Sequence, residues 1–194
     1  MIPFKKVWEK VEGIELVQVH DVEMEALYNR CFEFTKPHIV EIGCAHGAST
    51  TVLAQSAQQL GGRVSCVDSF PENYYAQEKF GAYAEKAFRT NVLDKYAQVV
   101  TLHKMNSQVG DPISYIDGLV GGSIQVLFID GDHSYEGVKN DCVRFLPYLQ
   151  SGGYVAFHDH NNVEFSGVQR AAGESTNDWK VVDSVWDLVI KRKP

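Results

Sequence analysis

The 194-residue sequence has little that would bind nucleic acid or cross a membrane. Lys and Arg number 18 against 25 for Asp and Glu, and the net charge of −7 disfavours a nucleic-acid partner, because phosphate binding relies on clustered cations. No apolar run approaches the length of a membrane span, and the amino-terminal residues lack the apolar core of a signal peptide. We therefore expect a cytoplasmic protein that has neither nucleic acid nor membrane as its partner.

Cysteine pairs and phosphate-binding loops are also missing. The four cysteines form no CxxC pair and no spacing typical of a metal site, so we expect reduced, buried thiols. Neither GxGxxG nor GxxxxGK[ST] occurs. These absences disfavour a dinucleotide or a nucleoside triphosphate as the ligand.

What the sequence does contain is an alternation of short apolar runs with amphipathic segments, which is typical of β-α units around a mostly parallel sheet. We expect a single domain, with a helical segment over 1–37 and a doubly wound, Rossmann-like α/β core over 38–194. The carboxyl-terminal WKVVDSVWDLVIKRK predicts an antiparallel hairpin with its turn near Asp183-Ser184.

The element boundaries follow from the same pattern. Predicted strands are His38–Gly43, Arg63–Asp68, Gln98–His103, Ile124–Asp130 and Tyr154–His158. Apolar residues at helical spacing predict a helix from Met24 to Phe34. Further predicted helices are Ser49–Leu60, Gln77–Thr90, Ile113–Leu119, Tyr135–Leu149 and Phe165–Ala172. Gly152-Gly153 is the expected stop signal after the helix Tyr135–Leu149.

A glycine turn follows the first predicted strand, in VEIGCAHGAST (Val40 to Thr50). Gly43 and Gly47 permit positive φ and let a ligand approach the backbone, and Ser49 opens a helix whose free N–H groups suit an anionic group. In a doubly wound sheet, ligands bind beyond the carboxyl ends of the strands. The turn therefore predicts a ligand site, although a plain tight β-α connection explains it about as well.

A carboxylate at the end of the second strand makes the ligand more specific. Asp68 lies 21 positions after Gly47, where it can accept hydrogen bonds from both hydroxyls of a ribose. Together the turn and the acid indicate a nucleoside with a small anionic tail, which is the shape of S-adenosylmethionine.

VEIGCAHGAST resembles motif I of the class I S-adenosylmethionine-dependent methyltransferases, most of all the short E-x-G-x-x-x-G-x-S form of the catechol and sugar O-methyltransferase-like branch (methyltransferase family 24 type). The resemblance runs from roughly His38 to Asn161. It implies that S-adenosylmethionine is the cofactor, that Glu41 supports the loop and the methionine end, and that Asp68 holds the ribose. It also places HKMNSQ on the adenine side, with Ser107, Gln108 and Asn106 near the ring.

Acids and histidines gather after the next two predicted strands, in LFIDGDHSYEG and GGYVAFHDH. If these strands are neighbours, their ends lie about 4.8 Å apart, so their side chains can share one cation. Strand-end aspartates also cap helices, which is the alternative for any single residue. The cluster comprises Asp130, Asp132, His133, His158, Asp159 and His160.

The resemblance implies a divalent metal site here, because Asp130 and Asp159 match acids that metal-dependent O-methyltransferases carry. His158 stands where the second member of the acidic pair belongs, and we predict Asp130, His158 and Asp159 as ligands. The alternative for His158 is that it points away from the metal and acts in proton transfer. Magnesium prefers oxygen, whereas an imidazole favours manganese, iron, cobalt, nickel or zinc, so the choice between Mg and Mn stays open.

Methyl transfer to a hydroxyl requires alignment of the oxygen and removal of its proton. Asp132 and His133 are the candidate bases; the sugar-methyltransferase resemblance favours Asp132 slightly, while His133 has the better ordinary pKa. We expect a small-molecule hydroxyl (a sugar, a phenol or another metabolite) in a pocket near Phe70, Tyr74 and Tyr75. A homodimer is expected by analogy, and the alternatives are a nucleotide-dependent oxidoreductase or a non-catalytic cofactor-binding domain.

Overall fold

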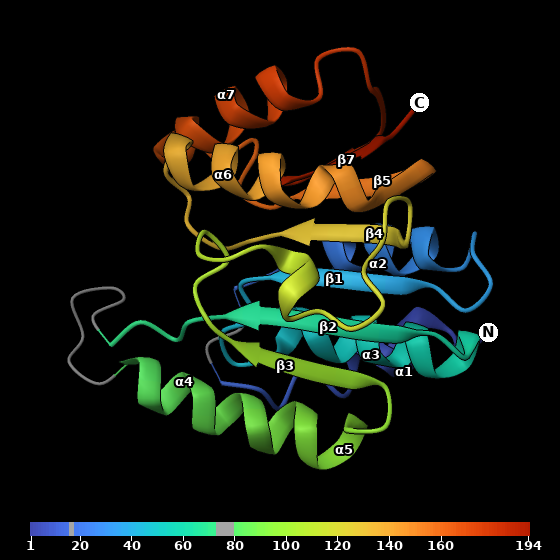
Figure 1. Cartoon of the computed structure of the whole chain (residues 1–194). Coiled ribbons are helices and arrows are strands. Elements are labelled where there is room, and N and C mark those ends of the chain that lie inside the picture. Colours follow the sequence, from blue (N-terminus) through green and yellow to red (C-terminus); the bar gives the residue numbers. More distant parts are fainter. Residues whose placement is uncertain (16–17, 73–79) are drawn as a thin grey trace.

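The computed structural model describes residues 1–15, 18–72 and 80–194, and these residues form a seven-stranded sheet flanked by helices (Figure 1). The strand order is β3-β2-β1-β4-β5-β7-β6, in which β1 to β5 run parallel and β5, β7 and β6 pair antiparallel. The predicted doubly wound α/β fold with its carboxyl-terminal antiparallel hairpin is confirmed. The strands are β1 (His38–Ile42), β2 (Arg63–Asp68), β3 (Val100–Lys104), β4 (Ile124–Ile129), β5 (Leu149–Phe157), β6 (Lys180–Val185) and β7 (Leu188–Arg192).

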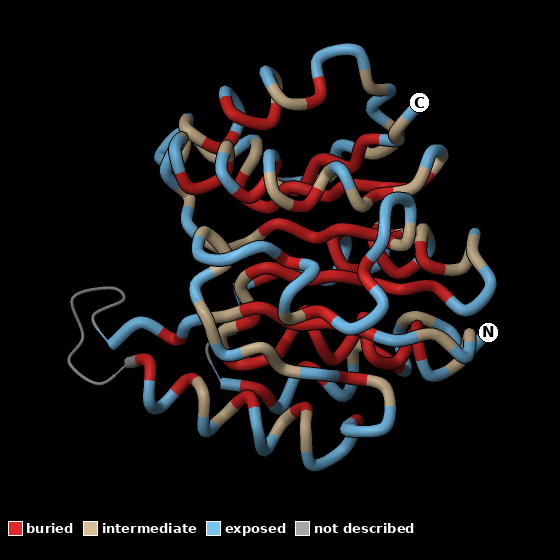
Figure 2. The backbone as a smooth tube through the Cα atoms, in the orientation of Figure 1, coloured by how far each residue is buried: buried red, intermediate tan, exposed pale blue. Residues whose placement is uncertain are grey.

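The central strands are buried because helices cover both faces of the sheet. All five residues of β1 are buried, and their side chains alternate between two apolar clusters, with Ile39 on one face and Val40 and Ile42 on the other. Figure 2 shows these strands in the buried colour, while the helices expose their outer sides. Near-continuous apolar runs are the expected sequence of such strands.

Two helical layers sandwich the sheet. The first layer packs on the face that carries Ile39. It contains α1 (Phe4–Trp8), α2 (Asp21–Cys31), α3 (Ala48–Leu60), α4 (Phe80–Phe88), a π-helical segment Arg89–Leu93, and α5 (Asp94–Tyr96). In Figure 1, α1, α2 and α3 lie behind the sheet, and α4 and α5 lie below β3. The second layer contains α6 (Tyr135–Phe145) and α7 (Ser166–Ser175). Within the described chain no helix is both long and apolar enough to cross a bilayer.

The predicted helix Ile113–Leu119 is wrong. Only a 3-10 turn, Pro112–Ser114, forms there, and Gly118 then adopts a φ of 69°, which a helix does not accommodate. Ile116 and Leu119 are nevertheless buried in the second cluster. Their apolar spacing therefore reports a loop packed on the core rather than a helix.

Other boundaries also differ from the predictions. The helix predicted to reach Phe34 ends as α2 at Cys31, and the helix predicted over Tyr135–Leu149 stops at Phe145. Leu149 starts β5, so that Gly152-Gly153 lies inside a strand. Pro147 explains the earlier stop, because it cannot continue the helical hydrogen-bond ladder.

The hairpin turn is also displaced. Asp183 and Ser184 lie within β6, and the turn consists of Trp186 and Asp187, after the pairing of Val185 with Leu188. Trp186 has a φ of 52°. A tryptophan is not a typical residue for positive φ, which is why the sequence pattern pointed to the more ordinary Asp-Ser pair.

Candidate functional site

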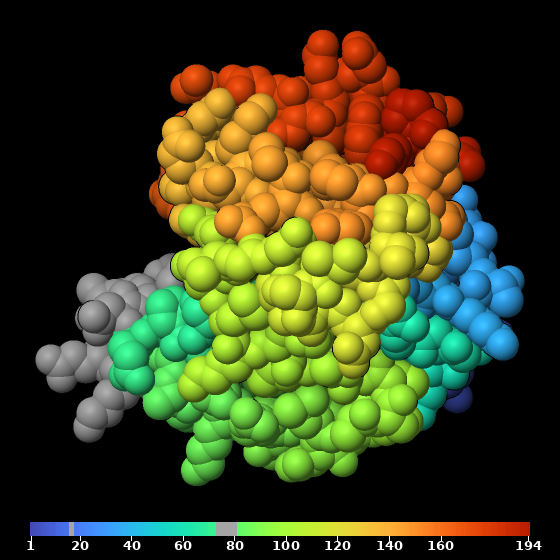
Figure 3. Space-filling model, viewed as in Figure 1, coloured from blue at the N-terminus to red at the C-terminus, as the bar shows by residue number. Residues whose placement is uncertain are grey.

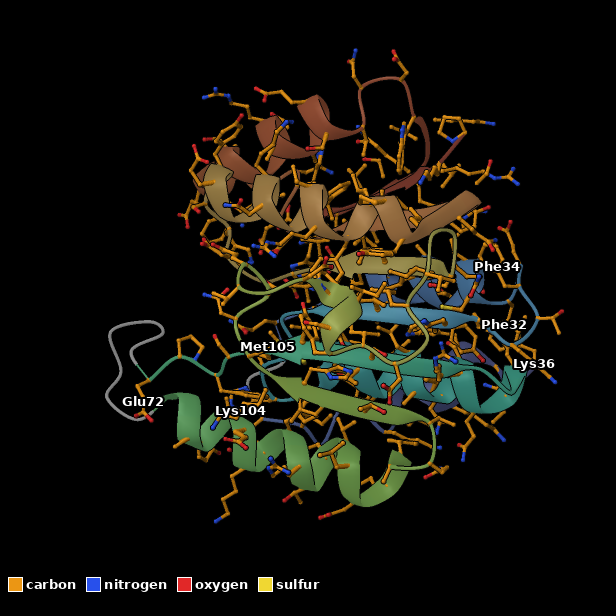
Figure 4. All side chains as sticks on the ribbon, viewed as in Figure 1. Phe32, Phe34, Lys36, Glu72, Lys104 and Met105 are labelled. Atoms are coloured by element: carbon orange, nitrogen blue, oxygen red, sulfur yellow. The ribbon has the colours of Figure 1, made fainter. Side chains whose placement is uncertain are left out.

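A cavity of about 1000 Å³ opens at the carboxyl-terminal ends of the parallel strands. Met105, which lines the cavity, marks the carboxyl-terminal ends of these strands in Figure 4, and Lys36 marks the opposite ends. In the space-filling view the segment between β3 and β4 lies over the front of the sheet (Figure 3). Most of the site residues predicted from the sequence line this cavity; Glu41, Gly47 and His160 are not part of its lining.

We call the turns after β1, β2 and β3 the cofactor half of the cavity. Glu41, at the end of β1, is completely buried and accepts hydrogen bonds from Ser49 Oγ at 2.5 Å and Thr50 Oγ1 at 2.6 Å. Burial raises the pKa of Glu41 to about 7, although these hydroxyls oppose the shift. Glu41 thus fixes the first turn of α3 against β1.

The two glycines of the turn are required by close packing. A Cβ at Gly43 (φ 82°) would lie 2.1 Å from the carbonyl oxygen of Asp130, and a Cβ at Gly47 (φ 88°) would lie 2.3 Å from a methyl group of Val92. The sequence suggested that both glycines admit a ligand. In the structure Gly43 lines the cavity while Gly47 makes room for the π-helical segment.

Asp68 joins the first two turns. Its Oδ2 accepts hydrogen bonds from the amides of Cys44 (2.8 Å) and Ala45 (3.0 Å), and its Oδ1 accepts one from Phe70 (2.6 Å). Because a carboxylate has about four acceptor positions, capacity remains for a hydroxyl from the cavity side. This anchoring of both loops is a structural role that sequence reasoning missed.

Backbone strain concentrates around the cavity. Five described residues other than glycine have a positive φ, and three of them line the cavity: Ala45 (41°), Phe70 (48°) and Asp159 (53°). Such conformations persist only where surrounding contacts enforce them, and they are common at functional sites. Phe70 is buried against Phe88, while Tyr74 and Tyr75 lie outside the described residues.

The predicted adenine-side residues follow β3. Asn106, Ser107 and Gln108 all line the cavity, and the side chain of Asn106 accepts a hydrogen bond from the amide of Gln108 at 2.8 Å. Gln108 Nε2 donates to Asp132 Oδ2 at 3.2 Å. The segment is therefore a polar turn that connects the cofactor half to the residues after β4.

We call the turns after β4 and β5 the acid-histidine half. β4 and β5 are parallel neighbours, as the prediction required. Nε2 of His133 lies 3.3 Å from Asp130 Oδ1 and 3.4 Å from Asp159 Oδ2, and Nδ1 of His158 lies 3.2 Å from the same two oxygens. Two imidazoles thus bridge one pair of carboxylates from two sides.

The charges in this half support one another. Although burial opposes the shift, His158 and His133 lower the pKa of Asp130 to about 2, and they also lower the pKa of Asp159. The carboxylates in turn raise the pKa of both imidazoles above the ordinary value, against the effect of burial. Ligand atoms of Asp130, His133 and Asp159 all lie within 4.8 Å of one another, a separation that suits a shared cation.

A fifth residue lies behind His158. Nε2 of His158 is 3.3 Å from Oε2 of Glu23, which is completely buried in the first turn of α2. Glu23 was not among the predicted site residues, because 135 positions separate the pair. The only local signal is its place three residues after His20, which is typical of a helix cap.

The two candidate bases occupy different surroundings. Asp132 is exposed and accepts hydrogen bonds from the Ser134 amide at 2.9 Å and from Gln108, so it faces the start of α6 and the adenine-side turn. His133 faces the carboxylate pair, and its ring packs on Phe165 with centroids 4.6 Å apart. The geometry therefore favours His133 over Asp132. The third histidine, His160, lies outside the cavity wall.

In open α/β sheets, ligands bind beyond the carboxyl ends of the strands, where this cavity lies. The sequence profile of a family described as a methyltransferase domain, methyltransferase family 24, matches residues 40–160, which is more than half of the chain. The protein belongs to this family of class I S-adenosylmethionine-dependent methyltransferases. Membership confirms the resemblance drawn from motif I and disfavours the oxidoreductase alternative.

A relative of known sequence is similar to about two thirds of this chain. Uncharacterized protein R132 of Acanthamoeba polyphaga mimivirus is 27% identical over 130 residues, and the match covers 66% of this chain. It covers 53% of R132, so the chain matches about half the length of this relative.

Two solved structures share the fold over nearly the whole chain. The apo structure of CalS11, a TDP-rhamnose 3'-O-methyltransferase of calicheamicin biosynthesis, superimposes with a TM-score of 0.66 at 16% identity and covers 97% of this chain and 92% of CalS11. PaMTH1 of Podospora anserina, a methyltransferase solved with S-adenosylhomocysteine bound, gives a TM-score of 0.66 at 14% identity, with 98% and 87% of the two chains covered.

Proposed function

We propose that this methyltransferase transfers a methyl group from S-adenosylmethionine to a hydroxyl oxygen of a small molecule, with a divalent cation at the acid-histidine half of the cavity. The observation that carries the proposal is that Asp130, His133, His158 and Asp159 face one another inside the same cavity as the motif I turn. Crowded ionisable groups beside a cofactor cleft are typical of a catalytic centre.

The cofactor half fits S-adenosylmethionine. Gly43 and Ser49 line the cavity at the start of α3, where free backbone N–H groups suit the carboxylate of the methionine end. Asp68 has remaining acceptor capacity for ribose hydroxyls, and Ser107 offers a hydroxyl on the adenine side. Bound here, the cofactor supplies a methyl group already activated by the sulfonium.

The donor set of the acid-histidine half fits a divalent cation. Asp130 and Asp159 offer carboxylate oxygens, and either bridging imidazole can add a nitrogen. Such a mixed set favours manganese or another transition metal over magnesium. We assign Asp130, His158 and Asp159 as ligands; a cation held there would lower the pKa of an acceptor hydroxyl and orient it.

His133 is the base that this arrangement favours. It is partly exposed to the cavity, and it lies beside the acid pair that would orient the acceptor. Phe165 holds one side of its ring. A cation on Asp130 and Asp159 would neutralise the carboxylates that raise the pKa of His133, and the neutral imidazole could then accept the hydroxyl proton as the methyl group is transferred.

The acceptor is a small molecule that reaches the cavity beside Phe70 and Phe165. A volume of about 1000 Å³ lies at the upper end of ordinary ligand pockets, so cofactor and a small acceptor fit together. CalS11, which shares the fold, is a TDP-rhamnose 3'-O-methyltransferase. We therefore place sugars and catechol-like phenols first among the acceptors to be tried.

The test combines binding with turnover. A ligand at 100 times its Kd stabilises a protein by about 2.7 kcal/mol, so S-adenosylhomocysteine should raise the Tm by roughly 5–10 °C. Labelled methyl transfer to a panel of sugars and catechols should then occur with Mn²⁺ and stop in chelator. Full turnover in chelator would contradict the metal assignment, and cofactor binding without transfer to any acceptor would favour the non-catalytic alternative.

A further inference from the structure

Glu23 is an unusual buried carboxylate. It belongs to α2, before the first strand, and none of its surface is exposed to solvent. Burying a carboxylate is costly unless it is paired and hydrogen-bonded. Its partners therefore indicate what it does.

The contacts of Glu23 come from three distant parts of the chain. Oε2 accepts a hydrogen bond from the His20 amide at 2.8 Å, and Oε1 accepts one from the Asp187 amide at 2.9 Å. Nε2 of His158 lies 3.3 Å from Oε2. A helix cap explains the first contact, but neither the burial nor the contact with His158.

The contact with His158 decides which way the imidazole faces. With Nε2–H directed at Glu23, Nδ1 is left 3.2 Å from both Asp130 Oδ1 and Asp159 Oδ2. The ring is also held edge-on against Phe128, at a centroid distance of 6.2 Å and an interplanar angle of 78°. A histidine that binds a metal through one ring nitrogen usually donates the N–H of its other ring nitrogen to a carboxylate.

We infer that Glu23 is a positioning residue for the cation site: by holding Nε2–H of His158, it keeps Nδ1 directed between Asp130 and Asp159. The inference rests on the cation site of the proposed function. It concerns a residue outside the 40–160 region that the family profile matches, and Asp187 lies outside that region too. The amino-terminal helix and the carboxyl-terminal hairpin thus complete a site whose ligands lie in the core.

The other histidine supports this division of roles. His133 also directs a nitrogen at the two carboxylates, but its Nδ1 makes no hydrogen bond to any described residue, and Phe165 packs on its ring instead. An imidazole with a buried carboxylate behind it is fixed as a ligand, whereas one without such a partner is free to exchange a proton. His158 and His133 therefore have different roles at the same carboxylate pair.

The test is Mn²⁺ binding to the full chain with Glu23→Gln, measured by titration followed by electron paramagnetic resonance. Glutamine keeps the size of the side chain and can accept from one of the two backbone amides, but its NH2 group cannot accept from the other, and the carboxylate is lost. We expect Mn²⁺ affinity to fall by about 10–100-fold, with the Kd for S-adenosylhomocysteine unchanged. Glu25→Gln is the matched control, because Glu25 is an exposed acid on the same helix.

The outcomes separate the inference from the function on which it rests. Equal Mn²⁺ affinity for the wild type and Glu23→Gln overturns the positioning role while leaving the cation site in place. A wild type that binds no Mn²⁺, Co²⁺ or Zn²⁺ overturns both, and binding of S-adenosylhomocysteine then tests the cofactor half separately.

If Glu23→Gln does not fold, Glu23→Asp keeps the charge but shortens the reach, and should also weaken Mn²⁺ binding. Nitrogen NMR of His158 gives an independent readout: the wild type should carry its proton on Nε2 when the diamagnetic Zn²⁺ is bound. A proton on Nδ1 instead would overturn the inference.

Discussion

The two halves of the cavity hold their polar groups by different means. In the cofactor half, carboxylates are satisfied by neutral donors: hydroxyls of α3 for Glu41, and backbone amides for Asp68. In the acid-histidine half, Asp130 and Asp159 share two imidazoles as their partners, although Asn162 also donates to Asp159 Oδ1 at 3.0 Å. Neutral donors set a fixed shape, whereas ionisable partners leave a site that can exchange a proton or a cation. The halves should therefore respond differently to substitution.

The largest separation is expected from Asp159→Ala. Loss of a carboxylate shared by both histidines should remove cation-assisted alignment of the acceptor and lower methyl transfer by roughly 10²–10³-fold, equivalent to several kcal/mol. The Kd for S-adenosylhomocysteine should stay within about twofold, because the cofactor half is untouched. Parallel assays of turnover and calorimetric binding measure both. Equal loss of the two would show that the halves are not separate.

Gly43→Ala should break both halves together. The new Cβ would lie 2.1 Å from the Asp130 carbonyl oxygen, and the φ of 82° is unfavourable for alanine. We expect a loss of about 2–4 kcal/mol in the free energy of unfolding, measured with urea. Gly121→Ala is the control, since a Cβ there meets no atom within 4 Å. Similar curves for the two variants would contradict the packing argument.

Asp68→Asn should affect the cofactor half alone. An amide group cannot accept hydrogen bonds at both ends, so at least one of the amides of Cys44, Ala45 and Phe70 loses its partner. Each such bond to a charged group contributes about 1.5–3 kcal/mol. The Kd for S-adenosylhomocysteine should rise by at least about 10-fold with Mn²⁺ affinity unchanged, whereas exposed Asp178→Asn should alter neither.

The last prediction concerns Asp141, whose carboxylate is paired neither with neutral donors, as in the cofactor half, nor with imidazoles, as in the acid-histidine half. It is completely buried behind Gly131, and neither carboxylate oxygen has a hydrogen-bond partner within normal distance among the described residues. Burial raises its pKa from 3.8 to about 7, and the Ser107 side chain offsets part of the shift. The folded protein therefore binds a proton between pH 4 and 7 that the unfolded chain does not.

Stability contributed by this protonation falls as pH rises through that window. Asp141→Asn removes the dependence, so relative to the wild type it should gain roughly 1–4 kcal/mol between pH 4 and pH 8. Urea unfolding at the two pH values gives the difference. A constant offset between the variant and the wild type would mean that Asp141 does not titrate in this range.

Local signals in the sequence account for most of the cofactor half. The motif I turn, Asp68 and the adenine-side segment lie within one or two turns of the strands that carry them, and apolar runs locate those strands. For the acid-histidine half, the sequence predicted only that Asp130 and Asp159 would lie close together if β4 and β5 were neighbouring strands, which they are. Glu23 and Asp187 required tertiary contacts, since no sequence spacing relates them to His158.

The errors have the same origin. Ile116 and Leu119 are apolar although they lie in a loop, because that loop packs on the core, and Asp183 pairs with Ile190 of β7 instead of forming the turn. In both cases the tertiary structure overrides the local preference. The choice between Asp132 and His133 likewise depended on where each side chain faces, which sequence spacing does not determine.

Gly43 lies directly against the backbone of Asp130, and the amide of Asp130 donates to the Ile42 carbonyl at 2.8 Å. A ligand that shifts the first turn must therefore also shift the strand end that carries the first acid. Thermodynamic reciprocity then requires that the cation change the affinity for S-adenosylhomocysteine by the same factor by which S-adenosylhomocysteine changes the affinity for the cation. A titration of either ligand at fixed concentrations of the other would measure that factor from both directions.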